Sequence, residues 1–195
     1  REIARSLAVA GAAAVVSLPV ALALGPFLAR RQRTAWGWLL VAAPAVVPAP
    51  LVAVGLITLW NRPGLDAVYT SSAMPILAAV VRFAPLAAGI VAAQWRRLDP
   101  ALLDVARVLA PRPRQVVVQV LLPLLAPGCL AAMAGVFVLT LGELGATLLV
   151  APPGRSTLTL RIYNYLHYGA AGDVAGLCLV MLAMAVLAGL AAVAA

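Results

Sequence analysis

The sequence predicts an all-α protein, a polytopic bundle of about five transmembrane helices, and three observations carry this prediction. Hydrophobic residues make up 65% of the 195 residues and charged residues only 10%, whereas soluble domains carry about 25% charged residues. The apolar residues gather into five long runs that are nearly free of charge. The net charge of +8 comes from arginines that stand mostly between those runs, as in loops of membrane proteins. No arginine-rich face with interleaved aromatic residues points to nucleic acid.

Each apolar run is long enough to cross a hydrocarbon core, which is about 30 Å thick and needs roughly 20 helical residues. The third run is interrupted only by Arg82. The five predicted spans cover residues 6–29, 35–60, 67–95, 115–142 and 174–195.

The loops between the runs indicate how the chain is oriented. If the basic turn 30–34 lies in the cytoplasm, the loop 96–114 lies there as well, because two spans separate them. That side then carries eight arginines and the opposite side five. The positive-inside rule favours this orientation.

Two segments are then expected on the outer side. Residues 61–66, with the sequence NRPGLD, form a turn because Pro-Gly is a strong turn signal. Residues 143–173 contain a helix-breaking APPG sequence, after which apolar residues recur at helical spacing over 157–166 with tyrosines close by. Because aromatic residues favour the membrane–water interface, we expect a short interfacial or partly re-entrant helix there.

The stretch 98–123 is the only long break in the apolar sequence. Asp99-Pro100 is a helix-start signal, and residues 101–110 can form about three turns. Pro111 and Pro113 then end the helix, because each removes an amide donor and disfavours helical geometry in the residue before it. One face of this helix is apolar and comprises Leu102, Val105, Ala106 and Leu109.

This stretch resembles a cytoplasmic pattern of the permeases of bacterial binding-protein-dependent ABC importers. The pattern reads E-A-A, three residues, G, nine residues and I-x-L-P. Asp104 stands at the Glu position, and Ala110 stands at the Gly position. The remaining matches are Val105 and Ala106 at the two Ala positions, and Val120, Leu122 and Pro123 at the I-x-L-P end.

The resemblance extends over almost the whole chain and is closest to the ferric-iron-type permeases of that class. It rests on the segments 60–66 (WNRPGLD), 80–83 (VVRF), 143–149 (ELGATLL) and 161–164 (RIYN). It implies a permease component of an ATP-driven importer in the bacterial inner membrane, with ferric iron as the solute. Permeases for thiamine, polyamine, phosphonate and sulfate are similar, so these solutes stay open as alternatives.

The resemblance also implies the partners. An external solute-binding protein would deliver the solute, and a second permease half would complete the pathway. The coupling loop 96–115 would dock on a separate ABC ATPase and transmit its closure as a rigid-body motion. The implied ATPase contacts are Asp104, Val105, Ala106, Val108, Leu109 and Ala110.

Arg82 and Glu143 are the candidates for the translocation path. Arg82 is expected near the centre of the bilayer, where a charge is costly and must face protein or water. It could line the path or bond to carbonyls that Pro85 frees. Glu143 is expected at the outer end of the fourth span, where it could cap the next segment or line the external mouth. Their expected depths argue against a direct pair.

Few residues could support catalysis or bind a metal, so we expect no enzyme activity and no cofactor on this chain. His167 is the only histidine and lacks partners at metal-ligand spacing. Cys129 and Cys178 lie in apolar runs and are expected as small buried hydrophobes. Because no phosphate-binding G-x-x-x-x-G-K-[ST] loop occurs, any ATP that drives this protein binds to a partner chain.

Two other function classes of membrane protein are alternatives to a permease. A membrane-embedded enzyme would need clustered acids or histidines, but the six acids are scattered. An ion channel or secondary transporter is compatible with Arg82 and the proline-broken segments; co-purification with a stoichiometric ATPase would distinguish a permease from it.

We expect residues 1–195 to form one transmembrane permease domain within a longer polypeptide, such as the C-terminal half of a tandem permease.

Overall fold

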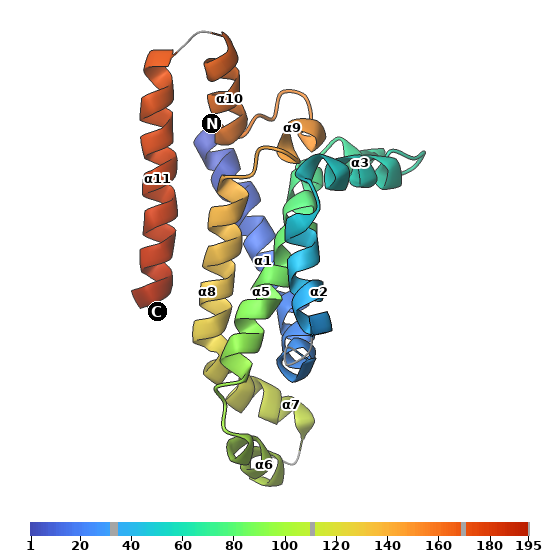
Figure 1. Ribbon diagram of the computed structural model, residues 1–195, viewed down its shortest axis with the longest axis vertical. Coiled ribbons are helices and arrows are strands. Elements are labelled where there is room, and N and C mark those ends of the chain that lie inside the picture. The colour runs from blue at the N-terminus through green and yellow to red at the C-terminus, as the bar shows by residue number, and fades with distance from the viewer. Residues whose placement is uncertain (32–34, 110–111, 169–170, 195) are drawn as a thin grey trace.

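The computed structural model describes residues 1–31, 35–109, 112–168 and 171–194, and within these ranges the chain is helical with no strand. Four helical segments are long and apolar enough to cross a membrane. They correspond to the helices α1 (Glu2–Arg31), α5 (Ala73–Trp95), α8 (Leu122–Leu141) and α11 (Ala171–Ala194). The predicted all-α membrane bundle is confirmed (Figure 1).

The core lies where α1, α5 and α8 pack against one another, and much of it consists of small residues. Because alanine and glycine have little side chain, membrane helices that carry them can approach closely. At Gly128 of α8, an added Cβ would lie 2.6 Å from Cβ of Gln94 on α5. The Gln94 side chain also donates a hydrogen bond across the same contact to the carbonyl oxygen of Leu124, at 3.3 Å.

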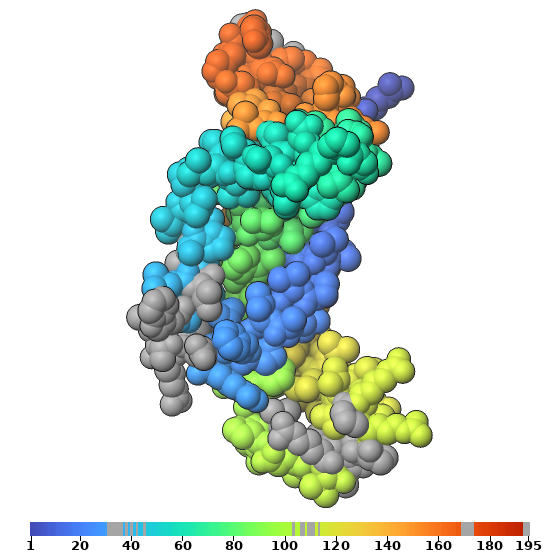
Figure 2. All heavy atoms as spheres, turned by 90° about the vertical axis from the view of Figure 1, so that its right-hand side faces the viewer, coloured from blue at the N-terminus to red at the C-terminus, as the bar shows by residue number. Residues whose placement is uncertain are grey.

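The second predicted span is wrong as a single helix. The chain forms α2 (Ala35–Val46) and then α3 (Ala49–Trp60), each only 12 residues long. Prolines at 44, 48 and 50 remove three amide donors within seven residues. As a result α3 turns away from α2 and lies across one end of the bundle (Figures 1 and 2).

The other predicted spans begin and end close to the expected residues. The third starts at Ala73 rather than 67, because the short helix α4 (Asp66–Tyr69) and a turn precede it. The fourth opens with α7 (Pro113–Gln115) and the π-helix η1 (Val116–Leu121) before α8. In η1 the Leu122 amide donates to the carbonyl of Val117, five residues earlier.

The segment 143–168 folds over the end of α8 as two short helices, α9 (Thr147–Val150) and α10 (Leu158–Tyr168). The predicted helix at 157–166 is therefore confirmed. The α10 helix is tied to α1, since the Leu158 amide donates to the hydroxyl of Ser6 at 2.7 Å.

Helix α11 packs on α8 and α10, and most of its remaining surface is exposed. Cys178 is exposed on it, so the expectation of burial is wrong for this residue, whereas Cys129 on α8 is buried as expected. The difference arises because α8 lies inside the bundle and α11 lies at its edge (Figure 1).

The predicted amphipathic helix is α6 (Pro100–Leu109), at the opposite end of the molecule from α10 (Figure 1). The Asp99 carboxylate accepts a hydrogen bond from the Ala101 amide at 2.9 Å, which satisfies a free donor of the first turn. Arg96, Arg97 and Arg112 flank this helix and are exposed.

Candidate functional site

An ion pair between Arg82 and Glu143 lies inside the helical bundle. Arg82 stands on α5, nine residues after Ala73 and so about 14 Å along the helix. Glu143 follows the last turn of α8. Their side chains are only 14% and 8% exposed, so the two charges neutralise each other largely away from solvent.

The expectation that these two residues lie too far apart is therefore wrong. It placed the outer surface at the end of α8. In the structure α9, α10 and the first turns of α1 extend beyond that end, so Glu143 lies within the molecule (Figure 1). A carboxylate at this depth can meet the guanidinium of Arg82.

Local structure fixes the Glu143 carboxylate. Its Oε1 accepts a hydrogen bond from the Ala146 amide at 2.9 Å, ahead of α9. Gly145 allows this turn to lie close against α3, since an added Cβ there would lie 2.8 Å from Cβ of Ala49. Glu143 thus connects α8, α9 and α5 through one side chain.

A small polar cavity of about 10 Å³ adjoins Glu143, which is room for about one water molecule. Its lining carries hydroxyl groups from α1, α8, α9 and the start of α10. They belong to Ser6, Thr140, Thr147, Thr157 and Thr159. By contrast, Nε of Arg82 is buried without a hydrogen-bond partner in the described part of the chain.

The second candidate region is α6, three of whose apolar side chains are uncovered. Leu102 is 52% exposed, Val105 55% and Val108 86%. Asp104 is also exposed on this helix. Ala106 and Leu109 lie in α6, but their side chains are outside the described part, and Ala110 lies outside the described residues altogether.

A third polar group lies where α1 meets α10. Arg161 forms an ion pair with Glu2 and donates from Nε to the Tyr165 hydroxyl at 3.0 Å. The hydrogen bond with Glu2, followed by that with Tyr165, raises the pKa of Arg161. Sequence reasoning missed this group, because 159 residues separate Glu2 from Arg161 and no short motif joins them.

His167 lies exposed on α10, and its Nδ1 is 2.9 Å from the carbonyl oxygen of Tyr163. Among the described residues no group of three or more His, Cys, Asp or Glu side chains could hold a metal ion. The four helical segments that are long and apolar enough to cross a membrane define the class as a multi-pass membrane protein.

A family model described as the binding-protein-dependent transport system inner membrane component matches residues 13–195. The chain therefore belongs to this family, the permeases of ABC importers in the inner membrane. The resemblance stated from the sequence is confirmed at the level of the family.

Curated relatives carry more specific names. The protein provisionally named 2-aminoethylphosphonate transport system permease protein PhnV, from Salmonella typhimurium, is 29% identical over 171 residues. The match covers 86% of this chain and 62% of PhnV, so the chain spans less than two thirds of that relative. PhnU of Salmonella typhi is 30% identical over 105 residues, 54% of this chain and 36% of PhnU.

Solved structures share the fold. A chain of the inward-facing MetNI methionine ABC transporter aligns with a TM-score of 0.74 and 21% identity, covering 98% of this chain and 91% of that one. A chain of a bacterial alginate ABC transporter aligns with a TM-score of 0.71 and 18% identity, covering 98% and 76%.

Proposed function

We propose that the chain is the membrane-spanning part of an ATP-driven importer for a small phosphonate, of which 2-aminoethylphosphonate is the model. The observation that carries the solute class is the 29% identity to PhnV across 86% of the chain. This favours the phosphonate alternative over ferric iron, the solute that the sequence resemblance first suggested.

The proposal includes a separate ATPase that docks on α6. Leu102, Val105 and Val108 are exposed at one end of the bundle, and the arginine distribution favours a cytoplasmic position for that end. Fully burying such a side chain is worth about 1.5–3 kcal/mol. A protein partner that covers α6 would therefore gain substantial binding free energy. The chain itself would bind no ATP and catalyse no reaction.

Arg82 and Glu143 take part in the proposal as residues of the pathway. A buried guanidinium attracts an anionic phosphonate once the solute enters the bundle, but in this structure the Glu143 carboxylate already neutralises it. Solute access to Arg82 would therefore require the ion pair to open. An external binding protein and a second permease half would supply the rest of the pathway.

The test is uptake by the full-length protein, expressed with its own ATPase and binding protein in cells that lack other phosphonate importers. We expect uptake of radiolabelled 2-aminoethylphosphonate that depends on ATP hydrolysis and saturates with solute. Radiolabelled ferric iron, thiamine and sulfate are measured in the same cells. Uptake of one of these instead of the phosphonate would refute the solute while leaving the permease class intact.

A further inference from the structure

We call the space between helices α1 and α11, which do not pack closely against each other, the seam. Helix α11 packs on α8 below and on α10 above rather than on α1, and its apolar surface is largely uncovered. Two hollows lie along this seam, one near the α10 end and one about halfway down the bundle.

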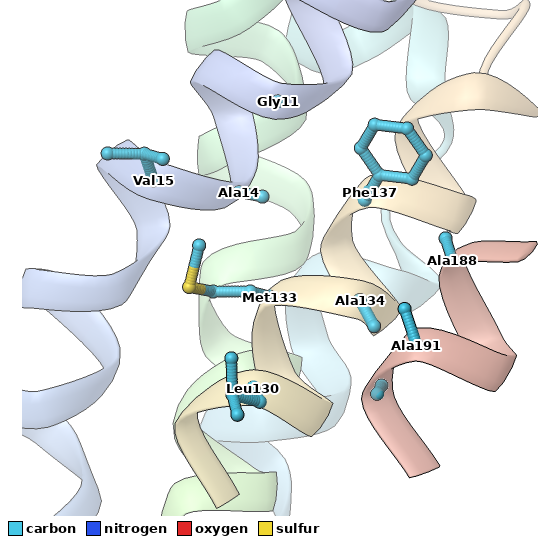
Figure 3. Close-up of a pocket in the computed structure, with 10 residues that line it drawn as sticks. Gly11, Ala14, Val15, Leu130, Met133, Ala134, Phe137, Ala188 and Ala191 are labelled. Carbon is cyan, nitrogen blue, oxygen red and sulfur yellow. The ribbon is translucent and has the colours of Figure 1, made fainter. Parts of the chain in front are cut away.

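The lower hollow is an apolar cavity of about 310 Å³. Small residues on α1 and α11 form two of its walls, and larger side chains of α8 form the third (Figure 3). The lining includes Gly11, Ala14, Met133, Phe137, Ala188 and Ala191. Such a surface offers no hydrogen bond and suits only hydrocarbon.

The upper hollow is an amphipathic groove of about 550 Å³. Its polar wall carries Arg1, Glu2, Arg161 and the Tyr165 hydroxyl, and its apolar wall on α11 includes Val180. Two guanidinium groups and one carboxylate leave a net charge of about +1, and Arg1 has no side-chain partner in the described part of the chain. The groove is therefore complementary to a singly charged anion that is attached to an apolar tail.

The two hollows have the separation that a lipid requires. The groove is lined by α11 residues 176–180 and the cavity by residues 188–192, a step of twelve residues or about 18 Å. One leaflet of a bilayer has a hydrocarbon thickness of about 15 Å. A tail that starts at the arginines would thus end in the cavity.

We propose that the seam between α1 and α11 binds one phospholipid, with its phosphodiester at Arg1 and Arg161 and one acyl chain in the cavity. The lipid would fill the gap beside α11 and join that helix to α1. This inference does not depend on the transported solute.

The test is native mass spectrometry of the full-length protein, purified with its partner chains and exchanged into phosphatidylglycerol or into phosphatidylcholine with identical acyl chains. We expect one retained phosphatidylglycerol per permease chain. Ala188→Phe should fill the cavity and lower its retention about tenfold. Ala183→Phe is the matched control, since Ala183 is exposed on the same helix outside the cavity.

The headgroup contact is tested separately with Arg1→Gln and Arg161→Gln, each of which should weaken phosphatidylglycerol retention about tenfold. Arg155→Gln is the control, because Arg155 is an outer arginine that does not line the groove. Equal retention by Ala188→Phe and Ala183→Phe would overturn the proposal. So would loss of all lipid from the wild-type complex, or a disulfide crosslink from Ala188→Cys to a helix of another chain.

Discussion

Replacing Arg82 with Leu should destabilise the permease, because it leaves the Glu143 carboxylate without its counter-ion inside the bundle. Both side chains are largely buried, at 14% and 8% exposure. Breaking a buried ion pair from one side costs about 3–5 kcal/mol. Glu143 keeps its hydrogen bond from the Ala146 amide, which favours the lower half of that range.

A double variant distinguishes the interaction between Arg82 and Glu143 from the effect of each residue on its own surroundings. In Arg82→Leu/Glu143→Gln no charge is left in the bundle, and the Gln carbonyl can still accept from the Ala146 amide. We expect this variant to recover much of the loss, since replacing a whole buried pair by uncharged groups is often close to neutral. Arg82→Lys keeps the charge and should be milder than Arg82→Leu both in stability and in uptake.

The assay is the thermal melting of the purified complex. For a domain of this size, about 1 kcal/mol corresponds to a shift of about 2–4 °C, so a loss of about 3–4 kcal/mol in Arg82→Leu should lower the Tm by about 6–16 °C. Arg62→Leu is a control, because Arg62 lies in an exposed turn. If the decreases in Tm of the two single variants simply add in the double variant, the energetic coupling between Arg82 and Glu143 is refuted. Full uptake by Arg82→Leu would refute a role of Arg82 in the pathway.

Three further predictions concern other parts of the molecule. Cysteines introduced at Arg97 and Asp66, in a variant without the two native cysteines, should be labelled from the cytoplasm and from outside, respectively. Labelling of position 97 from outside intact cells would contradict the topology. Asp104→Arg and Ala110→Trp should insert normally but lose ATPase co-purification and uptake; unchanged binding and uptake in both would make 96–115 only a connector. Gly128→Val should push α8 from α5 and lower the Tm by several degrees, since overpacking costs about 1–3 kcal/mol. A Tm equal to that of wild type would show that Gln94 moves aside freely.

The helices at the two ends of the molecule could be predicted because their signals are local. The start signal Asp99-Pro100 and the apolar spacing after it define α6 within a few residues. In α10, Leu158 and Ile162 are the buried members of the predicted apolar row, and Leu166 is exposed. Such patterns need no knowledge of distant segments.

The break between α2 and α3 could not be read from proline alone. Helices α1, α5 and α8 carry prolines in their interiors and remain continuous, because neighbouring helices can satisfy the carbonyls that a proline frees. Pro44 lies inside α2 in the same way, whereas Pro48 takes an extended backbone with a ψ of 132° just before α3, and the helix breaks there. The Arg82–Glu143 pair escaped prediction for a similar reason, since its depth depends on how 143–168 covers the bundle.

The two candidate regions of the site lie at the two ends of α8, and this arrangement gives the proposed coupling a physical route. Helix α6 contacts η1, which continues directly into α8. The α8 helix of 20 residues is about 30 Å long, and Glu143 follows its last turn. A rigid-body shift of α6 on ATPase closure would thus reach the ion pair through one continuous element. If it does, Arg82→Leu and Asp104→Arg should fail in different ways: the first should retain ATPase binding and lose coupled uptake, whereas the second should lose binding itself. Loss of ATPase binding in Arg82→Leu, in a complex that still inserts and melts cooperatively, would show that the ion pair holds α6 in place rather than responding to it.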